Sequence, residues 1–205
     1  MYAATVNGQR LTFSVIGVWR RNLIMQDRET GTVWQQATGE ALHGPLKGTQ
    51  LALIGGEQTT WGDWQARHPR TAVSTEPAHP PKGLLSFSQL EFLLEKFTSR
   101  YKTPGLHRND TRLPSHEEVG GLVLNGAARA YPLSQLKRSP IVPDTLGGVP
   151  LVVRYDAHHD RIDAYCLAAD GRPDLTQPLP IQRQFWLGWS EFQPHTTIFN
   201  HNHAG

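Results

Sequence analysis

The pattern Trp-x-x-Trp-x-x-x-x-Pro-x-Thr occurs twice in this chain of 205 residues, at positions 61–71 and again at positions 186–196. Both copies keep all four defining residues, and together they hold four of the six tryptophans in the chain. A repeated motif of this kind indicates that the chain was assembled from two related units, each containing the same short element.

We predict that each copy of the motif forms a short helix, near residues 60–68 and 185–193. In the first copy Thr60 can cap the helix and Asp63 can answer it three positions later, while Pro69 ends the helix. Trp61 and Trp64 then share one face. This face could be an aromatic platform for a sugar or a base, or it could fix the helix to a sheet, with each indole burying about 150–250 Å². We favour the second interpretation.

Most of the remaining sequence predicts strands and hairpins. Apolar residues alternate with polar ones over residues 11–15, which is the pattern of a half-buried strand. Asn-Gly pairs favour tight hairpin turns, and a polar run between apolar runs favours a turn. These signals predict turns at Asn7-Gly8, at residues 27–31 and at Asn125-Gly126, and a further strand at residues 50–54.

One longer helix is expected in the middle of the chain, around residues 86–100. Ser86 and Gln89 form a capping box, and the apolar residues that follow keep helical spacing. The predicted fold class is therefore mainly β (β-rich α+β), with antiparallel sheets, this one amphipathic helix and the two short tryptophan helices. We expect a β-rich part over residues 1–75, a linker with the helix over 76–118 and a second β-rich part over 119–200, joined in one compact body.

Composition narrows the classes of function. The net charge is +2 and the chain has no run of Lys or Arg, so we expect no nucleic-acid partner. No apolar run approaches the roughly 20 residues of a membrane span. The first residues do not resemble a signal peptide, which predicts a cytoplasmic location by default, or export if the true N-terminus lies upstream. With a single cysteine, Cys166, the chain can form no internal disulfide.

Two stretches of the chain are similar to a known family. The motifs are Asp27-Arg28-Glu29-Thr30-x-x-x-Trp34, Gly39 to Gly48, Asn125-Gly126-x-x-Arg129-Ala130-Tyr131-Pro132-Leu133, and Asp144-Thr145-x-Gly147-Gly148-x-Pro150. They resemble the two halves of the repeat in the bacterial and archaeal domain of unknown function 3179 family. The resemblance implies the back half of one repeat followed by a shortened second repeat, with the tryptophan helix as the closing element of each. The family implies no established activity.

The chain departs from this family at a position that carries chemistry. The family typically continues from its Gly-Gly-x-Pro strand into Tyr-Cys-Pro-Leu-Cys-Gly, whose two thiols suit redox exchange or soft-metal binding. Here the matching residues are Tyr155-Asp156-Ala157-His158-His159. A histidine that precedes glutamate in the family is also replaced, by residues 137–142. The resemblance therefore implies a member without the Cys-x-x-Cys motif.

Two groups of side chains are candidate sites. Charged, aromatic and amide groups on short turns can converge on a rigid sheet, although charged turns more often serve turn geometry and surface ion pairs. The candidate ligand-binding residues, taken from both β-rich parts, are Arg28, Glu29, Trp34, Gln36, His43, Arg129 and Tyr131. Carboxylate and imidazole groups suit a divalent metal such as Zn²⁺ or Mn²⁺. The candidate metal ligands are Asp156, His158 and His159, in a predicted turn that could equally be a solvated polar loop.

The sequence favours a non-catalytic domain with a binding or structural role. The alternative is a metal-binding or redox-related enzyme descended from a Cys-x-x-Cys-containing family, with a divalent metal as its cofactor. If the shortened repeat leaves a sheet open, the free edge favours a homodimer.

Overall fold

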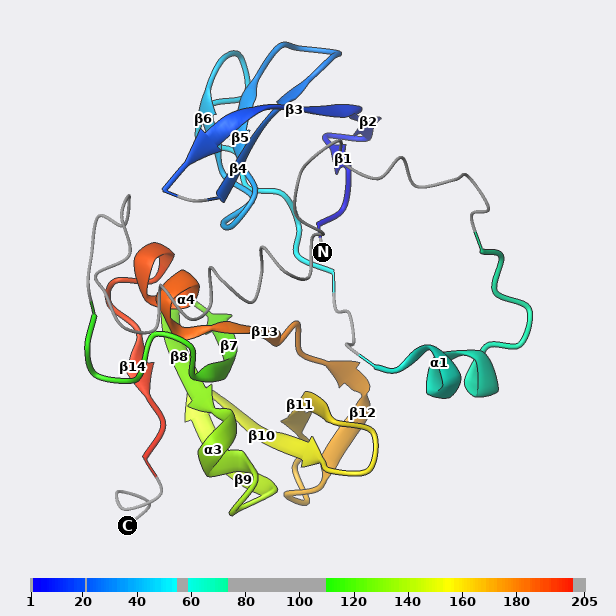
Figure 1. Ribbon diagram of the computed structural model, residues 1–205, viewed down its shortest axis with the longest axis vertical. Coiled ribbons are helices and arrows are strands. Elements are labelled where there is room, and N and C mark those ends of the chain that lie inside the picture. The colour runs from blue at the N-terminus through cyan, green and yellow to red at the C-terminus, as the bar shows by residue number, and fades with distance from the viewer. Residues whose placement is uncertain (1, 21, 55–58, 74–109, 201–205) are drawn as a thin grey trace, which may run out of the picture. The chain divides into compact units, whose positions relative to one another are not determined.

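The computed structural model of the chain describes residues 2–20, 22–54, 59–73 and 110–200 (Figure 1). The chain divides into two compact units, one formed by Met1–Gln58 with Gly105–Gly205 and the other by Thr59–Pro104. The described elements are mostly strands, which confirms the mainly β fold class. None of the helices in the described ranges has the length and apolar character that crossing a membrane requires.

The N-terminal strands form a four-stranded antiparallel sheet and a small hairpin. The sheet has the order β3-β4-β5-β6, and β1 pairs with β2. The bounds are β1 Thr5–Val6, β2 Gln9–Arg10, β3 Phe13–Trp19, β4 Asn22–Asp27, β5 Val33–Gln35 and β6 Ala41–His43. The sheet and the hairpin share a small core. The core is built around the fully buried Trp34, with Val6, Leu11, Ala41 and Leu51.

The C-terminal strands form two further four-stranded sheets. One has the order β12-β11-β10-β9, and the other has the order β13-β7-β8-β14, in which β14 runs parallel to β8. The bounds are β7 Glu118–Leu124, β8 Ala127–Pro132, β9 Ile141–Leu146, β10 Val149–Asp156, β11 Arg161–Leu167, β12 Pro173–Pro178, β13 Gln182–Phe185 and β14 Thr197–Ile198. Three short helices are described: α1 Trp61–Arg67, α3 Leu133–Leu136 and α4 Trp186–Phe192.

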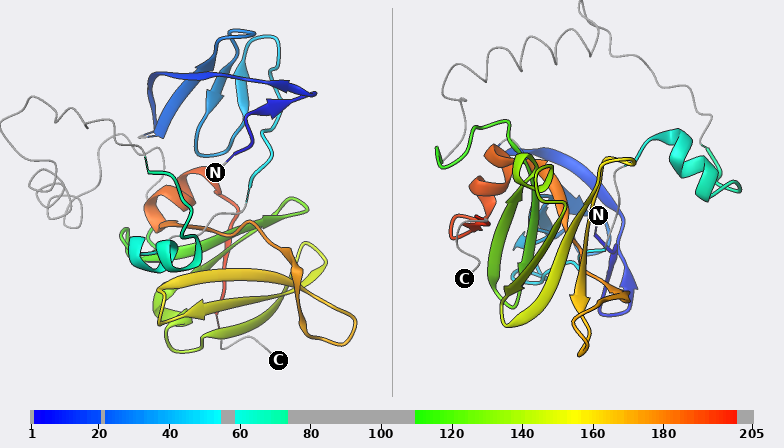
Figure 2. Two further views of the ribbon diagram at one scale, coloured as in Figure 1. Left: turned by 90° about the vertical axis from the view of Figure 1, so that its right-hand side faces the viewer. Right: turned by 90° about the horizontal axis from the view of Figure 1, so that it is seen from below.

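The C-terminal sheets pack face to face, with α4 on the outer side of β7 and β8 (Figure 2). The core between the sheets joins Leu122 and Tyr131 of one sheet to Leu151 and Val153 of the other. The opposite face of β7 and β8 carries Val119 and Ala130, which pack against the two tryptophans of α4. This part of the chain thus has a layer of helix followed by two layers of sheet.

The predicted turns are confirmed. Asn7 and Gly8 have φ values of 50° and 79°, and Asn125 and Gly126 have values of 48° and 78°. Both central residues of a type I′ turn need positive φ, which Asn and Gly tolerate best. The first pair joins β1 to β2, and the second joins β7 to β8, in register from Leu124 opposite Ala127.

The predicted strand at residues 50–54 is wrong. Only isolated bridges form there, between Glu40 and Gln50 and between Tyr2 and Leu53. The physical reason is that the segment crosses several neighbours in turn: the Leu51 amide donates to Gly39, and the Ala52 carbonyl accepts from Ala3. The helix predicted around 86–100 lies outside the described residues, and α3 was not predicted.

Both predicted tryptophan helices are present, but their surroundings differ. In α1, Thr60 caps the helix and accepts a hydrogen bond from the Asp63 amide, as predicted. None of the residues of α1 is buried, and Trp61 is 53% exposed. In α4, Trp186 and Trp189 are 0% and 1% exposed. The interpretation that the two indoles fix the helix to a sheet is therefore confirmed for α4.

A glycine on the sheet allows the close approach of α4. A Cβ atom placed on Gly121 of β7 would collide with the six-membered ring of Trp189. Because the backbone carries no side chain at this position, the ring can lie flat against the strand. The packing of Trp189 on β7 therefore requires glycine at position 121.

We predict that Gly121→Ala lowers the free energy of unfolding by about 1–3 kcal/mol, because it overpacks a filled site. Urea denaturation followed by tryptophan fluorescence measures this change. Gly17→Ala in β3 is the control, since no atom lies within 4 Å of the added Cβ atom. Equal stability of the two variants would contradict the packing argument.

Candidate functional site

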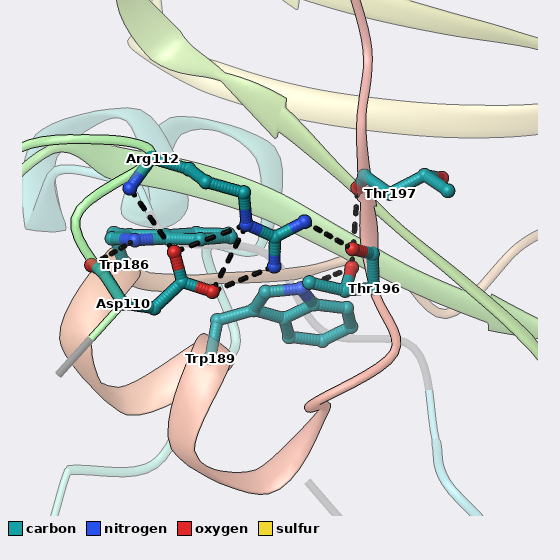
Figure 3. A network of polar contacts seen from close by, with 6 residues as sticks. All are labelled: Asp110, Arg112, Trp186, Trp189, Thr196 and Thr197. Atoms are coloured by element: carbon teal, nitrogen blue, oxygen red, sulfur yellow. Dashed lines mark hydrogen bonds and ion pairs between the residues drawn. The ribbon is translucent and has the colours of Figure 1, made fainter. Parts of the chain in front are cut away.

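The second copy of the tryptophan motif is a closed set of hydrogen bonds (Figure 3). The Trp189 indole Nε1 donates to Thr196 Oγ1 over 2.8 Å, and this bond is buried. The Gln193 amide donates to the Trp189 carbonyl, and the Thr196 amide donates to the Gln193 carbonyl. The spacing from tryptophan to threonine is thus the spacing at which the chain turns back and offers a hydroxyl to the indole.

The first copy of the motif contains the same bonds. The Trp64 Nε1 donates to Thr71 Oγ1 over 2.9 Å. The His68 amide donates to Trp64, and the Thr71 amide donates to His68. The repeated residues therefore encode one local structure, and this structure forms in both environments.

The second copy is further held by the segment before β7. The Trp186 Nε1 donates to the Asp110 carbonyl over 2.9 Å, and Arg112 Nη1 donates to the Thr196 carbonyl over 2.9 Å (Figure 3). The guanidinium of Arg112 also lies over the Trp186 ring, 5.2 Å from its centroid. An ion pair of 2.6 Å joins Arg112 to the Asp110 carboxylate. Both indole N–H groups of α4 are thus satisfied.

Arg129 and Tyr131, two predicted ligand-binding residues, meet at one carboxylate. Arg129 Nη1 lies 2.5 and 2.7 Å from the two oxygens of Asp144, and the Tyr131 hydroxyl donates to Asp144 Oδ2 over 2.7 Å. The pKa of Tyr131 is raised, mainly by burial and secondly by the hydrogen bond to Asp144. Arg129 Nε also donates to Thr197 Oγ1 on β14. The two residues lie two positions apart on β8 and so share one face of the strand, and Asp144 lies on β9 of the other C-terminal sheet.

A pocket of about 280 Å³ opens beside Arg129. One side is formed by the β7–β8 turn and the end of β9, with Thr145. The other side is formed by the connection from α4 to β14, which belongs to the tryptophan motif. The lining residues are Gly126, Ala127, Ala128, Arg129, Thr145, Leu146, Gly147, Gln193, Pro194, His195 and Thr197. The motif therefore positions one wall of this pocket.

The other five predicted ligand-binding residues lie in the N-terminal sheet. Arg28 and Glu29 are exposed on the β4–β5 turn, where Arg28 Nε donates to Ser14 Oγ and Glu29 accepts the Thr12 amide over 2.7 Å. Trp34 is fully buried. Gln36 and His43 are exposed at the ends of β5 and β6. Their convergence with Arg129 and Tyr131 on one pocket stays a prediction.

Asp27, which was not among the predicted site residues, is the centre of this turn. Asp27 is 1% exposed; its carboxylate accepts from Trp34 Nε1 over 2.8 Å and from the Thr30 amide and hydroxyl. Burial alone would raise the pKa of Asp27, but the bonds from Trp34 and Thr30 outweigh it and hold the pKa below its usual value. The sequence signal that could have indicated Asp27 is its position seven residues before Trp34, from whose indole N–H it accepts a hydrogen bond.

Of the three candidate metal ligands, Asp156 ends β10, and His158 and His159 lie in the β10–β11 turn. Asp156 accepts the backbone amides of His158 and His159, and its Oδ2 lies 2.7 Å from His159 Nδ1. The bond from His159 lowers the pKa of Asp156 to about 2. The two imidazole rings lie edge to face, 4.6 Å apart. In the part of the chain that the structure describes, no group of three or more His, Cys, Asp or Glu side chains could hold a metal ion.

Polar contacts also fasten the end of this turn. The Tyr155 hydroxyl donates to Asp160 Oδ1 over 2.8 Å. Arg183 on β13 donates to both the carbonyl and the carboxylate of Asp160, and also to Glu118 on β7. The turn is therefore tied to the neighbouring sheet by an arginine that bridges two carboxylates.

The motifs of both halves agree with a comparison against family models. The model described as Protein of unknown function (DUF3179) matches residues 1–84 and 97–165, more than half of the chain. The chain belongs to the DUF3179 family. Comparisons with curated proteins and with solved structures gave no match.

The DUF3179 match covers one copy of the tryptophan motif but not the other. Residues 61–71 lie inside the matched span, and residues 186–196 lie beyond its end. The equivalence of the two copies therefore rests on their residues and on their shared hydrogen bonds. The pocket draws one wall from the matched DUF3179 span and the other from the segment after it.

The two copies of the motif allow a paired test of the indole–threonine bond. We predict that Thr196→Val lowers the free energy of unfolding by about 1–3 kcal/mol, because it leaves a buried indole N–H without an acceptor. Thr71→Val should change stability by less than about 0.5 kcal/mol, since water can reach the exposed copy. Equal effects in urea denaturation would show that burial does not decide the value of the bond.

The lowered pKa of Asp27 predicts a pH dependence. Its carboxylate stabilises the fold fully above the unfolded-state pKa of about 3.9, and this contribution is lost as the pH falls through the lower folded-state pKa. Asp27→Asn should therefore lose stability at neutral pH, and its difference from the wild type should shrink in acid. Urea denaturation across a pH series measures it, with exposed Asp170→Asn as the control. A difference that stays constant with pH would contradict this role.

Proposed function

We propose that this protein is a non-catalytic binding domain and that the pocket beside Arg129 is its ligand site. The observation that carries the proposal is a hollow whose lining includes several polar residues. Thr145, Gln193 and His195 line the pocket, and none of the three side chains makes a hydrogen bond to another residue in the described ranges. Arg129 Nη2 likewise has no such partner. A few polar groups with free hydrogen-bonding capacity at a pocket are what fix the orientation of a ligand.

The carboxylate closest to the pocket favours binding over catalysis. Asp144 accepts from Arg129, from the Tyr131 hydroxyl and from the Thr145 amide, which lies 2.7 Å away. A carboxylate that already holds these donors has little capacity left to take a proton from a ligand. Its role is to orient Arg129, and a charged partner is well suited to fix the plane of a guanidinium.

The walls of the pocket are held by regular structure on both sides. Arg129 lies on β8, which pairs with both β7 and β14. Pro194 and His195 lie in the connection that the Trp189–Thr196 bond closes. A site held in this way loses little conformational freedom when a ligand binds, so that more of the contact energy appears as affinity.

The ligand class follows from the donors and from the size. Guanidinium, amide, hydroxyl and imidazole groups all donate to oxygen, so the pocket suits a small ligand rich in acceptors, such as a carboxylate or a phosphate ester. A volume of about 280 Å³ lies just below the range of roughly 300–1,000 Å³ for ligand pockets, which favours a small ligand. Asp144 balances the charge of Arg129, which favours a ligand with one or two negative charges over a polyanion.

We predict that acetate and inorganic phosphate shift the backbone amide resonances of Gly126, Thr145 and Gly147 in NMR titrations, and that the shifts saturate. A double variant, Thr145→Val with His195→Ala, should weaken this binding at least about tenfold, because two donors are removed. Both side chains are exposed, so the fold should persist.

His158→Ala is the matched control, since this histidine is also exposed but lies in the β10–β11 turn. It should leave the titration unchanged. Shifts that grow linearly without saturation, or that are equal in the wild type and the double variant, would contradict a site in this pocket.

A further inference from the structure

We propose that strand β3 is an interaction surface on which two copies of this chain pair edge to edge, forming a homodimer through one continuous sheet. This proposal does not depend on the pocket beside Arg129. It rests on which strands lie at the edges of the sheets and on how each edge is protected.

The C-terminal part of β3, from Val15 to Trp19, exposes an unusual concentration of large apolar side chains. Val15, Ile16, Val18 and Trp19 are 60%, 52%, 67% and 45% exposed. They account for four of the eleven large hydrophobic residues that are exposed in the described ranges. The strand pairs with β4 on one side, and its other side has no strand partner among the described residues. An edge of this kind combines unpaired backbone groups with apolar surface.

The other edge strands carry features that discourage pairing. Proline removes a backbone donor, short strands offer few bonds, and charged residues repel a partner strand. Strand β12 has Pro173 and Pro178, and β9 has Pro143. Strands β6 and β14 have three and two residues, and β13 carries Arg183. Strand β3 has seven residues without proline or charge, so it is the edge best suited to accept another strand.

A second copy of the chain is the occupant that these features favour. Two identical strands can pair antiparallel about a two-fold axis, so that each edge satisfies the other. Since residues 13–19 contain no charged side chain, no like charges meet across the axis. Edge-to-edge pairing of one seven-residue strand buries a small area compared with the roughly 1,200–2,000 Å² of a stable interface.

The expected dimer is weak and reversible. Strand β3 has one protective feature, a bulge between Val15 and Gly17, where the register with β4 shifts. A bulge interrupts the regular ladder and limits the number of bonds that a partner can form. Together with the small area, this favours a dimer that forms at high protein concentration and dissociates on dilution.

Sedimentation velocity over about a hundredfold range of protein concentration tests the proposal, because the monomer–dimer balance of a weak complex moves across such a range. We expect the wild type to change from monomer to dimer. Val18→Lys should raise the dissociation constant at least about tenfold, since it places two charges close to the axis. Hydrogen exchange should slow for the amides of residues 13–19 as the concentration rises.

Ile141→Lys is the matched control. Ile141 is also 67% exposed, lies on an edge strand, and belongs to β9 with its proline. The Ile141→Lys variant should dimerise as the wild type does. A wild-type monomer at every concentration, or a dimer that Val18→Lys and Ile141→Lys affect equally, would overturn the proposal. Association without protection of residues 13–19 would overturn it as well.

Discussion

The hydrogen bond between the Trp189 indole and Thr196 is the contact on which the C-terminal architecture depends. Trp189 is 1% exposed, and a buried indole N–H without an acceptor destabilises the fold. Thr196 supplies this acceptor from seven residues further along the chain. The chain must therefore turn after α4, and this turn brings Thr197 and Ile198 parallel to β8. The pocket beside Arg129 exists because the same turn places Pro194 and His195 opposite β9.

The local structure of the motif could be predicted from the sequence, because it is determined by near neighbours. Thr60 and Asp63 cap α1 as their spacing indicates, and the Asn-Gly pairs make the expected turns. Burial could not be predicted in the same way. Trp61 and Trp186 occupy equivalent positions in the motif, yet one is 53% exposed and the other is 0% exposed. The difference comes from the surface that each helix meets, which lies far away in the sequence.

The candidate sites show the same division between local and distant determinants. Asp156, His158 and His159 were expected in a turn, and the two histidines lie in one, because turn chemistry is local. The partners of Arg129 required the pairing of β8 with β14 and the position of β9, which a single sequence does not reveal. The segment at residues 50–54 failed as a strand for a related reason: its backbone bonds go to different neighbours, and alternation of side chains does not say which neighbours are available.

The two copies of the tryptophan motif have the same local structure but different surroundings. The bonds from Trp64 to Thr71 and from Trp189 to Thr196 are almost equal in length, at 2.9 and 2.8 Å. Among the described residues, only the second copy packs against a glycine of a strand, and the residue after it, Thr197, accepts a hydrogen bond from Arg129, which pairs with Asp144. The motif alone thus supplies a rigid corner in the chain. The proposed ligand site needs in addition Gly121, which lets the indole approach β7, and the residues of β8 and of β9 in the facing sheet that line the same hollow.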